Sequence, residues 1–223
     1  TMWYHVLNCG YRVRASGETD FPCISGERVG LGRVYVKLDG PLDFNAWVDG
    51  LQAGRSYVSD GTTHLLDFAA TGAARTVECG TGKSEVSLDA AGTVAFTVTA
   101  AARGAAGTTV PVELVVNGFP VAKQEIPADG AMHALSFTHT FPRSAWVAVR
   151  SFPRAHTNPL FVIVAGKPIR ASADSARWCA ACVEQCWKTK ERSYRAEEQE
   201  AARAAYEVAR TAYARIEREC AAP

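Results

Sequence analysis

The sequence predicts an α+β chain of several regions: an α/β fragment over residues 1–60, an immunoglobulin-like antiparallel β-sandwich over residues 61–172 and a helical tail over residues 173–223. Three observations support this division. Helical and strand-like patterns alternate in the first region, and short β-rich runs separated by turn-forming residues fill the second. In the third region an alanine-rich helical periodicity takes over.

The first region contains two expected helices and two expected strands. Residues 2–10 read as a short helix ended by a glycine, and residues 11–16 alternate like a strand. After a glycine-rich loop, residues 33–40 read as a second strand, and residues 41–54 as a helix that a glycine ends. The apolar stripe of this helix comprises Phe44, Trp47, Val48 and Leu51. Such a mixture suits the end of an α/β layer structure.

The second region reads as a series of strands. The expected strands are residues 64–70, 74–79, 84–89, 93–101, 110–118, 121–126, 133–141, 144–152 and 160–166. Alternation is clean at Val94, Phe96 and Val98 and again at Trp146, Val147 and Val149. About nine strands at this spacing favour two antiparallel sheets packed as an immunoglobulin-like sandwich.

The tail reads as two helices. Ser172 and Asp174 offer N-caps for the first, which runs through "SARWCAACVEQCWKTK". The second carries an a/d stripe made of Ala202, Tyr206, Ala209, Tyr213, Ile216 and Cys220. We expect this stripe to pack against the preceding helix in antiparallel orientation, because short isolated helices are marginal in water. The alternative is a second copy of the chain, so a monomer or a weak dimer through the tail is expected.

Composition narrows the classes of partner. The chain has 24 basic and 23 acidic residues, so nothing indicates binding to nucleic acid or to an anionic membrane. No apolar run approaches the roughly 18 residues of a membrane span. The start "TMWYHVLN" has no signal-peptide features and opens directly in a helical pattern, so an upstream part of the same polypeptide is the expected partner. The seven scattered and clustered cysteines leave the compartment open.

The loop "GETD" holds the main candidate site residue. Asp20 lies just past the expected end of the first strand, where α/β barrels carry catalytic groups. A carboxylate there can ligate a metal if histidines or other acids converge on it. The alternative is that Asp20 and Thr19 hold the loop through hydrogen bonds from side chain to backbone, and the spacing alone favours this interpretation.

Residues 3–61 resemble the final barrel segment of PHP-superfamily metallohydrolase-like proteins, in the CehA/McbA-like branch. Residues 144–172 and 175–187 resemble the C-terminal region of the same proteins. The resemblance implies that residues 1–60 are the last elements of a distorted β/α barrel, whose histidines and acids bind two or three metal ions.

The resemblance also bears on the metal ligands. The family's last motif is Asp-x-His; Asp20 matches its aspartate, but Pro22 stands at the position of its histidine. The resemblance therefore implies a remnant metal site here, with Asp20 as a ligand. A divalent metal such as Zn, Mn or Fe is possible in a full-length parent, and none is firmly expected in this chain.

Three further groups of side chains could carry chemistry. Arg28 could meet an anionic group of a substrate, and His5, on the first helix, is a candidate for substrate binding. The cysteines of the tail, Cys179, Cys182 and Cys186, share one face of a helix, so they are expected to pack in a core. The alternatives are a zinc site with a fourth ligand from elsewhere and a redox dithiol, for which the usual βαβ setting is absent.

Two functions follow. The first is the C-terminal part of a PHP-like metal-dependent hydrolase of ester or phosphoester bonds, which supplies the rim loop and an accessory sandwich and is not catalytic by itself. The second is a non-enzymatic binding or assembly module built on the sandwich.

Overall fold

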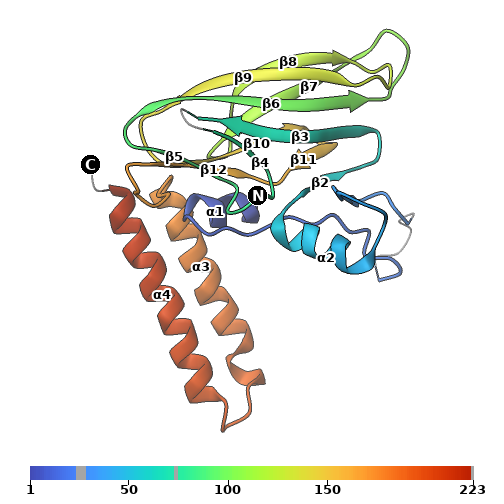
Figure 1. The fold of residues 1–223 in the computed structure, drawn as a ribbon. Helices are drawn as coiled ribbons and strands as arrows, with labels where there is room; N and C mark the ends of the chain where they lie inside the picture. Colours follow the sequence, from blue (N-terminus) through green and yellow to red (C-terminus); the bar gives the residue numbers. More distant parts are fainter. Residues whose placement is uncertain (24–28, 73–74, 222–223) are drawn as a thin grey trace. The chain divides into compact units, whose positions relative to one another are not determined.

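The computed structural model describes residues 1–23, 29–72 and 75–221, which belong to two compact units. The first unit combines Thr1–Val13 with Pro168–Pro223, and the second is Arg14–Lys167. Figure 1 shows the ribbon of both. None of the described helices combines the length and the apolar character needed to cross a bilayer.

The first unit is helical. Its elements are α1 (Met2–Asn8), α3 (Ala173–Lys190), the 3₁₀ turn η1 (Glu191–Ser193) and α4 (Gln199–Ala221). Ser172 is the N-cap of α3, because its hydroxyl accepts a hydrogen bond from the backbone N–H of Ser175 at 3.1 Å, whereas Asp174 lies in the first turn. Helices α3 and α4 lie side by side as a hairpin (Figure 1). Helix α4 therefore packs on the preceding helix of the same chain, as its a/d stripe predicts.

The second unit consists of β-strands and one helix. Its helix is α2 (Phe44–Ala53). Its described strands are β1 (Arg33–Val36), β2 (Ser56–Ser59), β3 (Thr63–Thr71), β4 (Thr76–Glu78), β5 (Glu85–Leu88), β6 (Gly92–Ala102), β7 (Thr109–Val116), β8 (Phe119–Pro127), β9 (His133–Phe141), β10 (Ala145–Ser151), β11 (Ala155–Thr157) and β12 (Leu160–Val164). Each of the nine runs predicted as a strand overlaps one of them.

These strands form two sheets. The larger sheet follows the order β1-β2-β11-β10-β12-β5, with β7 paired to β10 and β8 paired to β7; the smaller one follows β4-β3-β6-β9. All pairs are antiparallel except β12 with β5. Side chains of both sheets meet in one core, in which Phe96 of the smaller sheet and Val147 of the larger are fully buried. The arrangement is sandwich-like, with the two layers visible in Figure 1.

The alternation predicted in β6 is confirmed, but the one predicted in β10 is not. Val94, Phe96 and Val98 of β6 are buried while the residues between them are exposed. In β10 the five residues from Ala145 to Val149 are all buried. A strand that is covered on both faces loses its alternation, because neither face meets water.

Two local expectations for the first sixty residues are wrong. Residues 11–16 form no strand. The backbone of Ala15 instead pairs with a side chain: its N–H donates to Oδ1 of Asn158 at 2.8 Å. In α2, Phe44 of the expected apolar stripe is 75% exposed. The buried position of that helix is Gly50, where an added Cβ would lie 2.5 Å from a methyl group of Val36.

The described residues close no barrel. Strands β1 and β2 pair antiparallel, Val34 opposite Val58, and extend the edge of the larger sheet. Helix α2 connects them; Asp43 caps its start and Gly54, with φ of 79°, ends it in the left-handed conformation. This short β-α-β segment positions the pocket described below.

Candidate functional site

The residues predicted from the sequence are distributed over different parts of the chain. Asp20 belongs to the second unit, where its side chain is exposed and its φ is 57°. His5 belongs to the first unit and lies in α1. Arg28 lies outside the residues that the structure describes. His5 and Asp20 therefore do not share a compact unit.

His5 makes its contacts within the helical unit. Its Nδ1 lies 3.1 Å from the hydroxyl of Ser175, and its ring stacks on Trp178 with a centroid separation of 4.4 Å. Burial lowers the pKa of His5. The ring therefore favours its neutral form, which suits a packed helix contact.

The loop that carries Asp20 is fixed by side-chain hydrogen bonds. The hydroxyl of Thr19 accepts from the N–H of Gly30 at 2.9 Å and donates to the carbonyl of Gly32 at 3.3 Å. At its start, Asn158 holds the backbone of Ala15. Thr19 thus holds the loop through hydrogen bonds from its side chain to the backbone, as one of the two interpretations of the sequence predicts. Asp20 presents an exposed carboxylate on this anchored segment.

Metal ligands do not gather in the described part of the chain. Nowhere in residues 1–23, 29–72 and 75–221 do three His, Cys, Asp or Glu side chains come together where they could hold a metal ion. The donors present therefore do not fit a complete divalent-metal site, and no catalytic step through a metal is derived for this chain.

The cysteines of α3 differ in their environments. Cys179 is 4% exposed and packs with Cys9 and Ile216, whereas Cys182 is half-buried and Cys186 is exposed. Burial and then the neighbouring Cys179 raise the pKa of Cys9 to about 12, and burial raises the pKa of Cys179. Both thiols keep their protons. The core packing predicted for the three cysteines of α3 is confirmed for Cys179 and is wrong for Cys186, whose side chain is exposed.

A cavity of about 360 Å³ in the second unit, which the sequence patterns above do not predict, is a candidate site because it joins an aromatic wall to charged side chains. We call it the Lys37 pocket. It is lined by Tyr35, Val36, Lys37, Leu38, Arg55, Ser56, Tyr57, Leu65, Leu66, Asp67, Phe68, Glu78, Cys79 and Thr157. Its volume lies in the range of pockets that take small organic molecules.

Strand pairing builds the aromatic wall of the Lys37 pocket. Tyr35 of β1 lies opposite Tyr57 of β2, and their rings stack with centroids 5.1 Å apart and planes 7° apart. The hydroxyl of Tyr57 lies 2.7 Å from Nδ1 of His64, which holds the ring in place. Leu65 and Phe68, both nearly fully buried, complete the apolar lining.

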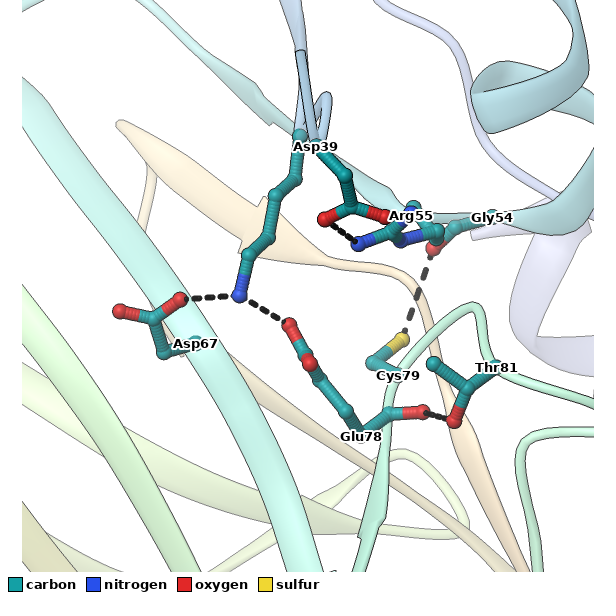
Figure 2. A network of polar contacts seen from close by, with 8 residues as sticks. Asp39, Gly54, Arg55, Asp67, Glu78, Cys79 and Thr81 are labelled. Atoms are coloured by element: carbon teal, nitrogen blue, oxygen red, sulfur yellow. Dashed lines mark hydrogen bonds and ion pairs between the residues drawn. The ribbon is translucent and has the colours of Figure 1, made fainter. Parts of the chain in front are cut away.

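Charged side chains line the Lys37 pocket beside the apolar wall. The ammonium of Lys37 lies 2.8 Å from a carboxylate oxygen of Asp67 and also bonds Glu78 (Figure 2). The hydrogen bonds that Lys37 donates, first to Asp67 and then to Glu78, raise the pKa of Lys37. The side chains of Lys37, Asp67 and Glu78 are 44%, 56% and 32% exposed, respectively, so each ion pair contributes at most about 1 kcal/mol to the free energy of folding.

A second ion pair lies next to the first. The guanidinium of Arg55 binds both carboxylate oxygens of Asp39, at 2.7 and 2.8 Å (Figure 2). The hydrogen bonds from Arg55 lower the pKa of Asp39. This fork uses both terminal nitrogens of Arg55 and leaves its Nε buried, without a partner among the described atoms.

The buried end of the Lys37 pocket contains a thiol. The Sγ of Cys79 lies 3.4 Å from the carbonyl oxygen of Asn158 and 3.6 Å from that of Gly54, a contact drawn in Figure 2. Burial raises the pKa of Cys79 to about 12. Cys79 is therefore a protonated, weakly polar lining residue and not a nucleophile.

Comparison with known proteins found neither a family model nor a curated protein that matches the chain. Function is therefore inferred from the residues and their geometry.

Proposed function

We propose that the chain is the C-terminal, non-catalytic part of a PHP-like metal-dependent hydrolase of the CehA/McbA-like branch. In this proposal β1, α2 and the loop around Asp20 are the last elements of the parent's barrel, and the two-sheet unit is an immunoglobulin-like accessory domain. Support comes from the sequence resemblance of residues 3–61 and from the mostly antiparallel sheets that share one core.

The observation that carries the proposal is the way in which Asp20 is presented. Its carboxylate is exposed, on a loop that Thr19 holds from within and that Asn158 ties to the larger sheet. An acid on an anchored loop can join ligands that another segment of the polypeptide supplies, because little conformational entropy is lost on binding. The active centre would then belong mainly to the parent's upstream part.

The experiment begins with the coding region upstream of Thr1, where a His-x-His motif after a strand pattern is expected. The longer polypeptide is then produced, and its metal content and its hydrolysis of ester and phosphoester substrates are measured. Asp20→Asn should lower both, and Glu18→Gln, an exposed acid of the same loop, is the matched control. The isolated chain should show no turnover.

Two results would contradict this proposal. One is turnover by the isolated chain that Asp20→Asn abolishes, since the chain would then be catalytic by itself. The other is an upstream region without the histidine motif, in a polypeptide that retains no metal.

The second candidate is a non-enzymatic binding module, and the Lys37 pocket favours it. The whole lining of this pocket lies between Tyr35 and Thr157, within one compact unit. A metal-free, inactive longer polypeptide that still binds a small molecule through this unit would support the second candidate.

A further inference from the structure

The Lys37 pocket joins an apolar interior to a charged rim. The half-buried Tyr35 and Tyr57 present ring surface, and the buried Leu65 and Phe68 form the apolar floor behind them. A bare inorganic ion would leave this surface without a partner, whereas an organic body of ring size would cover it. The interior therefore indicates an organic ligand.

The charges at the rim indicate the sign of its head group. Of the charged lining residues, Arg55 is paired with Asp39, an exposed carboxylate outside the lining. Lys37 alone therefore faces the two lining carboxylates, Asp67 and Glu78, which leaves one negative charge in excess. An anionic head group would find the Lys37 ammonium already bound to two carboxylates, and it would add to the excess charge. A cationic head group would reduce that excess, and aromatic rings also attract cations.

The Lys37 ammonium shows how the rim accommodates a cation. It bonds Asp67 of β3 and Glu78 of β4, and it comes from the residue that directly follows β1, so three segments meet at one cation. Its side chain is 44% exposed, so it can turn toward water when another ammonium arrives. Asp67 has a φ of 53° at an irregularity of β3, and such unfavourable backbone conformations concentrate at functional sites.

We propose that the Lys37 pocket binds a small organic amine, with its ammonium group at Asp67 and Glu78 and its apolar, ring-sized body against the two stacked tyrosines. Binding would be intrinsic to residues 14–167, whether or not the chain belongs to a hydrolase.

The test uses the full chain and three probes with the same body and different heads: phenethylamine, 3-phenylpropionate and 2-phenylethanol. Binding is measured by calorimetry and by ligand-observed NMR. The amine should bind at least about tenfold more tightly than the other two, as expected for a charge-assisted contact. The carboxylate probe is the sharpest competitor, because the unpartnered Nε of Arg55 is the feature of this lining that favours an acceptor.

Two substitutions at the rim locate the ammonium. Glu78→Gln should weaken amine binding about five- to tenfold, since one charged partner is lost at a partly exposed site. Lys37→Met should strengthen it, because the competing ammonium is removed while chain length is kept. Glu125→Gln is the matched control; Glu125 pairs with Lys123 on β8 and should have no effect. Thermal unfolding of each variant checks that it is folded.

Three outcomes would overturn the proposal. The first is no amine binding at millimolar concentration to either the native chain or Lys37→Met. The second is tighter binding of the carboxylate than of the amine. The third is binding seen only in Lys37→Met, because Lys37 would then be the permanent occupant of the rim.

Discussion

Asn158 is expected to anchor the segment that leads to Asp20, and replacing it with alanine tests this. The side chain is 1% exposed. Its Oδ1 accepts from the N–H of Ala15 at 2.8 Å, and its Nδ2 donates to Ser56 at 2.9 Å (Oγ) and 3.2 Å (carbonyl). Three such bonds at about 1 kcal/mol each put the loss for Asn158→Ala near 3 kcal/mol of unfolding free energy. The melting temperature of this unit should fall by about 6–12 °C.

Hydrogen exchange gives the local measurement. In the native chain the amide of Ala15 should be protected, and in Asn158→Ala it should exchange faster by a factor that matches the lost free energy, about a hundredfold for 3 kcal/mol. The control is Asn45→Ala, on the exposed surface of α2, which should leave both measurements unchanged. If the Ala15 amide exchanges equally fast in the native chain and the Asn158 variant, and the melting temperatures agree, Asn158 is not the anchor.

Three further predictions concern packing. Gly50→Ala should destabilise the second unit by about 1–3 kcal/mol in urea denaturation, because the new Cβ would overlap a methyl group of β1. Gly40 has open space around it, so Gly40→Ala should leave the stability unchanged. Tyr213→Asp should destabilise the helical hairpin by about 2–4 kcal/mol, and the exposed Thr211→Asp should not; equal melting curves for the two would contradict the packing. Cys9, with a pKa of about 12, should react with thiol reagents at pH 8 far more slowly than the exposed cysteines. Equal labelling rates, measured by mass spectrometry, would refute the burial of Cys9.

The longer strands could be predicted from the sequence because each carries its own evidence. In β6, alternation over Val94, Phe96 and Val98 specifies which face is buried without knowledge of a partner. The short strands β2 and β11 have four and three residues and pair with each other, and no β-rich run of greater length contains them, whereas the equally short β4 and β5 lie within such runs. Residues 11–16 alternate like a strand, yet the backbone of Ala15 pairs with the side chain of Asn158, a distant contact that alternation cannot show.

The candidate site could be predicted only in part, for a related reason. Asp20 and Thr19 were identifiable because they lie in one loop, and the sequence allows for a hydrogen-bonded threonine. The Lys37 pocket brings together side chains from β1, β3 and β4, whose positions in the chain follow no fixed spacing. The pairing of β3 with β4 and the packing of the two sheets on one core make Lys37, Asp67 and Glu78 neighbours.

The burial pattern of β3 shows how the Lys37 pocket acquires one of its carboxylates. Thr63 and Leu65 are buried at odd positions, and Phe68 and Ala70 are buried at even positions, so the inward face changes parity within one strand. A regular strand cannot satisfy both halves, because a shift of one residue exchanges its faces. The register irregularity between Leu66 and Ala69 resolves this conflict by inserting one residue. Without it, Asp67 would point inward with Leu65 and Phe68 would point outward. The same irregularity that keeps a carboxylate out of the core thus places it at the rim, facing the ammonium of Lys37.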